Sequence, residues 1–161
     1  MDRSPPSDVP VPDEPSEPES YRRGRKAVSG VTAAAALVGV AAFAFSRYRP
    51  ARVAIEGVSM APTLLPGDWV LVVTPTNYDR DDVVVVEHPQ RPGYEIVKRL
   101  IAVPGDEIAD GQILGSDEYW VEGDFAQSST DSRRFGPVTL EDLKAKAVLI
   151  YWPLERRRVV R

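Results

Sequence analysis

The 161-residue chain has no cysteine and a single histidine, His88. The absence of cysteine excludes thiol catalysis, disulfides and every metal site built on cysteine. One histidine excludes a multi-histidine metal site. Neither absence decides the compartment, because a chain without cysteine is compatible with either side of a membrane.

Positive charge and aliphatic residues are scarce at the N-terminus. Residues 1–20 hold six of the 15 prolines, six carboxylates, one arginine, and only Val9 and Val11 as aliphatics. Such a segment buries too little apolar surface to offset its ordering entropy, so residues 1–26 are predicted to be a disordered, acidic, proline-rich tail with a basic end. Residues 1–20 alone carry a net charge of −5 (six acidic, one basic), against −4 for the whole chain, and the near-neutral remainder argues against nucleic acid as the main partner.

Charge is also absent from residues 27–45. As a helix these residues would extend about 28 Å, close to the thickness of a bilayer core, which predicts a transmembrane helix. The basic residues on either side slightly favour an inside N-terminus, which would place the following domain, after a linker over residues 46–52, outside. Two alternatives are a short alanine-rich surface helix and a cleaved signal peptide ending at Ala42-Phe43-Ala44; the length of the apolar run and of the region before it favours a retained anchor.

Residues 53–153 are predicted to form one mostly β domain. Short runs rich in valine, isoleucine and tyrosine alternate with Pro/Gly turns. The expected strands are residues 53–55, 69–73, 83–87, 94–103, 119–122 and 147–152. Because residues 83–86 are all valine, they are expected to be buried on both faces, which favours a small antiparallel folded-over sheet or partly closed barrel. A short helix is expected over residues 140–146, and a solvated basic tail over residues 154–161.

Two residues have sequence surroundings that suit catalysis. Ser59 lies beside a proline turn. Lys98 lies in a predicted strand with Ile96 and Leu100 on its own face, and such burial would lower the pKa of its amine. Taken singly, Lys98 is better explained as an edge-strand lysine that reaches water, and Ser59 as a residue that opens a turn. Together they suggest a Ser–Lys nucleophilic dyad.

The motifs around these residues resemble those of the type I signal peptidase family. Residues 57–64 with Pro66-Gly67-Asp68 resemble the family's nucleophile box, and residues 97–106 resemble its lysine box. Residues 121–124 with 129–138 form a third match in the same order. The resemblance covers most of residues 53–138 and implies a membrane-anchored serine endopeptidase of the signal-peptidase fold.

The resemblance also implies roles for individual residues. Ser59 would be the nucleophile that forms an acyl-enzyme, and neutral Lys98 its general base. Ser129 matches the serine that holds the lysine amine, while Asp131 with Arg133 matches the supporting pair. Gly57 stands where some members have an oxyanion hydroxyl, so the oxyanion hole would rest on backbone N–H groups, chiefly that of Ser59.

The family further implies substrates and partners. These would be precursor proteins, cut after small residues at −1 and −3 and bound as an added β-strand, with membrane lipid nearby and no metal or cofactor. The expected location is the cell membrane, in a single pass, with the catalytic domain on the extracytoplasmic side.

Some features are open to other interpretations. Residues 88–99 and 131–138 with 151–153 also resemble nickel-type superoxide dismutase maturation proteases, which trim one leader from one precursor. A non-catalytic membrane-tethered β module is another alternative, although the presence of Ser59, Lys98, Ser129 and Asp131 together argues against it. His88 is expected in an exposed loop, where a solvated role is favoured over a catalytic one. Where the family's Gly-Asp is normally followed by Asn, this chain has Phe125, which affects the local turn.

Overall fold

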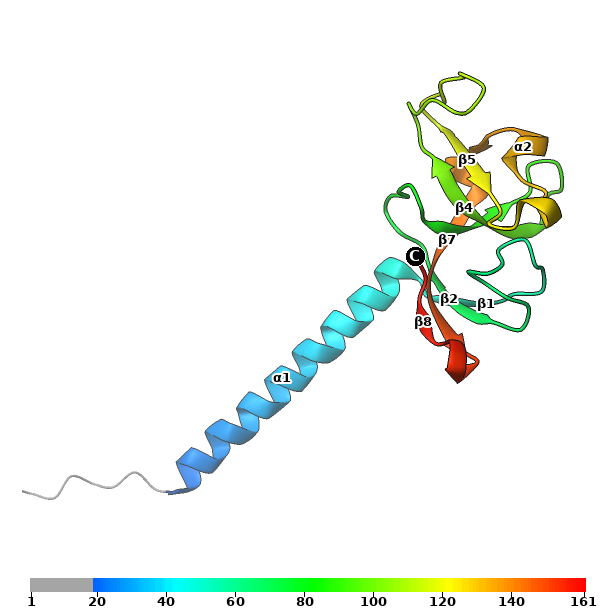
Figure 1. Ribbon diagram of the computed structural model, residues 1–161. Coiled ribbons are helices and arrows are strands. Elements are labelled where there is room, and N and C mark those ends of the chain that lie inside the picture. Colours follow the sequence, from blue (N-terminus) through cyan, green and yellow to red (C-terminus); the bar gives the residue numbers. More distant parts are fainter. Residues whose placement is uncertain (1–18) are drawn as a thin grey trace, which may run out of the picture. The chain divides into compact units, whose positions relative to one another are not determined.

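The computed structural model describes residues 19–161, shown in Figure 1. The chain divides into two compact units, Met1–Ala42 and Phe43–Arg161. The predicted tail lies outside the described residues over positions 1–18, whereas positions 19–26 belong to helix α1 (Glu19–Tyr48).

Helix α1 contains the whole apolar stretch 27–45, so the predicted helix is present. The helix is rich in alanine, the residue type with the strongest intrinsic helix propensity. Large apolar side chains of this helix, such as Leu37, Val40 and Phe43, are exposed. Within the described part of the chain, no helix has the length and apolarity needed to cross a bilayer. The transmembrane helix over residues 27–45 stays a prediction from sequence.

The second unit is built on one antiparallel sheet of eight strands. The strands are β1 (Ala51–Ala54), β2 (Trp69–Val73), β3 (Val83–Glu87), β4 (Glu95–Ala102), β5 (Glu118–Glu122), β6 (Val138–Thr139), β7 (Leu143–Trp152) and β8 (Arg158–Val159). They follow the order β1-β2-β7-β3-β4-β5-β6, and β8 pairs with β7. The mostly β, antiparallel prediction is confirmed.

The strand order does not confirm the partly closed barrel that the sequence predicted. Within residues 19–161 the two end strands, β1 and β6, do not pair with each other, so the sheet is open. The strands at the ends are also short, because β1 has four residues and β6 has two. Strands of this length offer few ladder hydrogen bonds with which to close a barrel.

Strand β3 is buried on both faces, as its run of valines predicted. Val83 and Val85 belong to one apolar core, and Val84 and Val86 belong to a second. Successive strand residues point to opposite faces, so a single strand serves both cores. The first core also contains Met60 and Leu64 from the connection between β1 and β2.

The helix expected over residues 140–146 is confined to one 3₁₀ turn, η2 (Leu140–Asp142). A capping box between Thr139 and Asp142 starts the turn, but β7 begins at once with Leu143. Leu143, Ala145 and Ala147 are buried, whereas the lysines between them are more exposed. This two-residue alternation favours a strand over a helix.

Five further elements were not predicted. They are η1 (Ala126–Ser128), α2 (Ser132–Phe135), β6, η3 (Leu154–Arg156) and β8. The last two lie in residues 154–161, which were expected to form a solvated tail. Instead β8 pairs with β7 through Leu149 and Ile150, and the segment is part of the folded domain.

Candidate active site

Ser59 lies in the connection between β1 and β2, which we call the Ser59 loop (residues 55–68). Hydrogen bonds close the base of the loop, from Ile55 N to Asp68 O (2.9 Å) and from Gly67 N to Ile55 O (2.8 Å). Met60 and Leu64 anchor it in the first apolar core, with 2% and 0% of their surface exposed. These contacts fix the base and the middle of the loop, and they leave Ser59 half-buried on a turn.

Lys98 lies in the middle of β4, between β3 and β5, and only 3% of its surface is exposed. Its Nζ is 2.8 Å from Ser59 Oγ and 3.0 Å from Val97 O. The interpretation as an edge-strand lysine that reaches water is therefore wrong. Burial lowers the pKa of the Lys98 amine; the negative charge of Asp131 opposes this shift and the positive charge of Arg133 adds to it.

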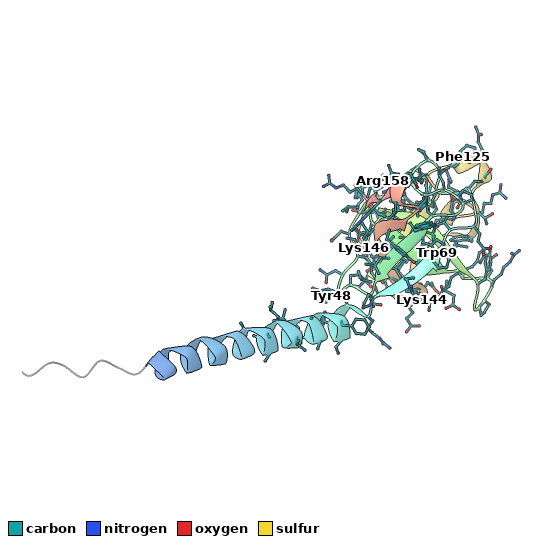
Figure 2. The ribbon with its side chains drawn as sticks, turned by 90° about the horizontal axis from the view of Figure 1, so that it is seen from below. Tyr48, Trp69, Phe125, Lys144, Lys146 and Arg158 are labelled. Atoms are coloured by element: carbon teal, nitrogen blue, oxygen red, sulfur yellow. The ribbon has the colours of Figure 1, made fainter. Side chains whose placement is uncertain are left out.

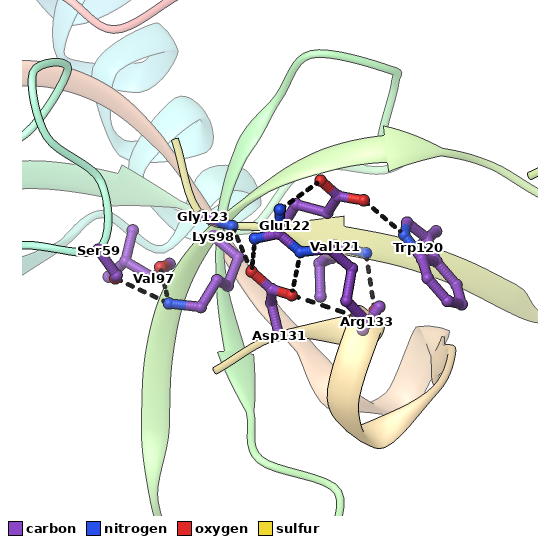
Figure 3. Close-up of polar contacts among 10 residues, drawn as sticks. Ser59, Val97, Lys98, Trp120, Val121, Glu122, Gly123, Asp131 and Arg133 are labelled. Atoms are coloured by element: carbon purple, nitrogen blue, oxygen red, sulfur yellow. Dashed lines mark hydrogen bonds and ion pairs between the residues drawn. The ribbon is translucent and has the colours of Figure 1, made fainter. Parts of the chain in front are cut away.

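Asp131 is the hub of a second polar cluster, drawn in Figure 3. Its side chain is fully buried and caps helix α2. The carboxylate accepts from Gly123 N (3.0 Å) and from Arg133 Nε (2.9 Å). Burial alone would raise the pKa of this carboxyl, but the Arg133 guanidinium and the Gly123 N–H hold it at about 2. Asp131 therefore stays ionised at every pH at which the protein is expected to work.

The packing between Ser59 and Ser129 depends on Gly123. A Cβ at Gly123 would lie 2.3 Å from Ser129 Oγ and 2.6 Å from Ser59 O, closer than real Cβ atoms approach. A hydrogen bond from Phe125 N to Ser59 O (2.9 Å) joins the same segment to the Ser59 loop. The Ser129 side chain is buried, and its Oγ has no hydrogen-bond partner in the described part of the chain.

Arg99 makes a further link between the three motifs. Its guanidinium forms a two-pronged ion pair with Asp124, with Nε–Oδ1 and Nη2–Oδ2 distances of 2.8 Å. Nη2 also donates to Thr63 Oγ1 at 3.2 Å. The ion pair fixes β4, the segment after β5 and the Ser59 loop with respect to one another.

A groove of about 530 Å³ runs past Ser59 and Lys98. The segment from Val53 to Met60 contributes one part of its lining, and the segment from Tyr94 to Lys98 another. Gly57 lines it too, and a Cβ at this position would meet nothing within 4 Å. The groove thus has room for an extended peptide beside Ser59.

His88 was expected to be exposed, and this is wrong, because 7% of its surface is accessible. Its ring lies 5.0 Å from that of Phe135, centroid to centroid, and Nδ1 accepts from Gln90 N. His88 lines the groove, but the side chain that contacts Ser59 Oγ is Lys98. The aromatic ring of α2 that covers His88 is distant in sequence, so the local Pro-rich pattern gave no sign of it.

Four of the six predicted site residues therefore form two pairs. Ser59 and Lys98 are in direct contact, while Asp131 and Arg133 form the adjacent ion pair. Prediction from sequence missed the steric role of Gly123 and the ion pair of Asp68 with Arg156. Arg156 lies 88 residues after its partner, in the segment expected to be a tail.

A buried amine held against a serine hydroxyl in an open groove fits the class of serine hydrolases that use lysine as the base. The model of the family described as "Signal peptidase, peptidase S26" matches residues 25–114 and 109–152. The chain belongs to this family and is a serine peptidase.

Curated relatives support the assignment. The chain is 38% identical over 120 residues to the mitochondrial inner membrane protease subunit 2 of Mus musculus, covering 63% of this chain and 67% of that protein. It is 36% identical over 120 residues to the subunit 2 of Saccharomyces cerevisiae (63% and 68%). It is 33% identical over 125 residues to the mitochondrial ATP-independent inner membrane protease subunit 1a of Arabidopsis thaliana (68% and 74%). These similarities make the chain a membrane-associated peptidase that removes signal or leader peptides from precursor proteins.

Proposed function

We propose that Ser59 is the nucleophile and Lys98 the general base of this signal peptidase. The observation that carries the proposal is the 2.8 Å contact between Lys98 Nζ and Ser59 Oγ, with the lysine almost fully buried. A lysine can take a proton only when its amine is neutral. Burial lowers the pKa of this amine and so raises the neutral fraction near neutral pH.

Acylation follows from this contact. The hydroxyl of Ser59 gives its proton to the lone pair of Lys98 Nζ as Oγ attacks the carbonyl carbon of the scissile peptide bond. The C–N bond of the resulting tetrahedral intermediate then breaks, and Lys98 returns the proton to the leaving amine. The N-terminal part of the substrate is now an ester on Ser59, and the mature protein is released.

Deacylation repeats the sequence with water. Lys98 takes a proton from a water molecule whose oxygen attacks the ester carbon, and the same proton returns to Ser59 Oγ when the ester bond breaks. The products are the free signal peptide and the unmodified serine. A single base serves both halves of the reaction, so no metal or cofactor is needed.

We assign the oxyanion hole to backbone N–H groups, chiefly that of Ser59. In residues 19–161 this N–H donates to no protein acceptor, so it is available to the developing negative charge. Gly57 has open space where a side chain would stand. The substrate backbone can therefore approach the loop closely and run beside it as an added strand, with small residues at −1 and −3 facing the groove.

Ser129, Asp131 and Arg133 are proposed as positioning residues. The buried hydroxyl of Ser129 meets no hydrogen-bond partner at full bonding geometry within the described residues, and it is proposed to hold the Lys98 amine. Asp131 is fixed by Arg133 and by the N–H of Gly123. It keeps the segment that carries Ser129 in place against Gly123.

We further propose that residues 27–45 hold the protein at the cell membrane in a single pass, with the catalytic domain on the extracytoplasmic side. The stretch carries no charge, and the family match begins at residue 25, so it includes this stretch. Extraction of membranes with alkaline carbonate tests the anchor, and added protease tests the side. Release of the full chain by carbonate would contradict the anchor, and protection of the catalytic domain in intact cells is expected only if it faces the cytoplasm.

The catalytic proposal is tested with a reporter precursor that carries an Ala-x-Ala signal peptide, in detergent. Wild type should cleave it, whereas Ser59→Ala and Lys98→Ala should be folded but inactive. A cut by either folded variant at the wild-type rate would contradict the assignment. If wild type leaves this reporter intact but cleaves a nickel superoxide dismutase precursor, the protein is a dedicated maturation protease with the same dyad.

A further inference from the structure

The C-terminal segment 154–160 reaches back to the Ser59 loop. The family match ends at residue 152, so this segment lies beyond the part of the chain that the family accounts for. It is held in place by the pairing of β8 with β7 and by a hydrogen bond from Val160 N to Val148 O (3.1 Å). Arg158, on β8, is labelled in Figure 2.

Two arginines of the segment contact the loop. Arg156 forms a two-pronged ion pair with Asp68, with Nε–Oδ1 at 2.7 Å and Nη2–Oδ2 at 2.9 Å. Asp68 is 1% exposed, and it also accepts from Leu65 N (2.9 Å). Arg158 Nη2 donates to Thr63 O at 2.8 Å. Both contacts involve charged groups, which make the stronger class of hydrogen bond.

Thr63 connects these contacts to Ser59. Residues 58–64 form a continuous turn, with hydrogen bonds from Ala61 N to Val58 O (2.9 Å) and from Leu64 N to Met60 O (2.8 Å). Thr63 is held from one side by Arg158 and, through its hydroxyl, from the other side by Arg99. The carbonyl and the hydroxyl of one residue therefore tie the turn to two separate parts of the domain.

We propose that Arg156 and Arg158 form a C-terminal clamp that positions the Ser59 loop against Lys98. The inference rests on the proposed catalytic roles of Ser59 and Lys98. Arg156 holds the base of the loop through Asp68, and Arg158 holds the turn that carries Ser59. Neither arginine touches the substrate groove, so both act through the loop.

The clamp has a consequence for Lys98, whose surroundings include the charges of Asp131 and Arg133. When Arg158 no longer holds Thr63, the turn that carries Ser59 can move away from Lys98 and admit water. Hydration favours the charged amine and moves its pKa back toward the ordinary lysine value. Activity, which needs the neutral amine, then begins at a higher pH.

The test compares Arg158→Ala with Arg157→Ala in the full chain. Arg157 is the adjacent arginine, and its side chain donates no hydrogen bond within the described residues, so it is a matched control. For Arg158→Ala we expect kcat to fall about tenfold with KM within about twofold of wild type, and the rising limb of the pH profile to move to higher pH. Arg158→Lys, which keeps one donor for Thr63 O, should recover part of kcat.

Hydrogen exchange gives a readout that does not need activity. The backbone amides of Ala61 and Leu64, which are hydrogen-bonded within the turn, should exchange about tenfold faster in Arg158→Ala than in Arg157→Ala. Equal exchange and equal pH profiles in the two variants would overturn the clamp. An inactive wild type would count against the proposed function alone, because the exchange comparison still decides the clamp. Arg156→Gln is a second variant, expected to lower stability as well because it leaves Asp68 buried without its ion pair.

Discussion

Replacing Gly123 by alanine adds a single methyl group, and we expect this addition to damage the active site. The new Cβ would lie 2.6 Å from the backbone oxygen of Ser59, 2.3 Å from Ser129 Oγ and 2.7 Å from Ser129 Cβ. Real Cβ atoms essentially never approach another heavy atom within 3.0 Å. The oxygen of Ser59 must therefore retreat by at least about 0.4 Å, and Ser129 Oγ by at least about 0.7 Å.

Neither neighbour can move without cost. The N–H of Gly123 is bound to Asp131, and the N–H of Phe125 is bound to the oxygen of Ser59. A shift of Ser59 also lengthens its 2.8 Å contact with Lys98. Overpacking of this kind costs about 1–3 kcal/mol of stability. A misplacement of about 1 Å costs a reaction about 10²-fold, so we expect a loss of about tenfold or more in kcat/KM.

The assay measures kcat/KM on the reporter precursor and the free energy of unfolding in urea. Gly115→Ala is the matched control, because the atoms nearest to its new Cβ belong to the flexible Glu118 side chain. Adding Ser129→Ala to Gly123→Ala removes the closest contact, so it should recover part of the stability without recovering activity. If Gly123→Ala cleaved within twofold of Gly115→Ala, the steric argument would be refuted.

Three further predictions concern ionisation and packing. Lys98→Met should abolish cleavage yet raise the free energy of unfolding at neutral pH, measured by urea denaturation, because it removes a buried amine whose pKa is lowered by burial. The unfolded chain holds that proton more tightly than the folded chain does. Wild-type stability should therefore rise with pH up to the ordinary lysine pKa, and the variant should lack this rise. Asp131, whose pKa is held at about 2, should contribute about 2 kcal/mol that is present above about pH 4 and lost as the pH falls toward 2. An Asp131→Asn protein with the same acid profile would exclude this carboxylate as the cause. Leu100→Ala, at a position with 0% exposure, should lower the free energy of unfolding by about 2–5 kcal/mol, and a loss well under 1 kcal/mol would show that the second core tolerates the cavity.

Strand positions were predictable where the pattern was local. Trp69–Val73 and Val83–Glu87 have the predicted bounds, because β-branched runs ended by Pro/Gly turns specify a strand by themselves. The prediction of a helix over residues 140–146 was wrong because it relied on the cap at Thr139, which starts only a single 3₁₀ turn. The alternation of apolar residues and lysines that follows the cap favours the strand instead.

The proposed catalytic pair could be predicted from the sequence, but the distant residues that hold the site in place could not. Ser59 and Lys98 could be inferred because each lies in a motif of characteristic spacing, and the structure brings the two together. The burial of His88 and the contacts of Arg156 depend on residues far away in the chain, Phe135 and Asp68. Prediction from local sequence cannot place such pairs, because their proximity arises only when the sheet forms.

The central claim is that Lys98 is a neutral amine poised to take the proton of Ser59, and the most direct test is to titrate that amine. Lysine side chains labelled with ¹⁵N and ¹³C would be followed by NMR in wild type, with Lys98→Ala used to assign the resonance. We expect the Lys98 signal to titrate below the ordinary lysine pKa of 10.5, at the pH where kcat/KM rises. A Lys98 signal that titrates at or above the ordinary lysine pKa, or at a pH unrelated to the activity profile, would contradict the account.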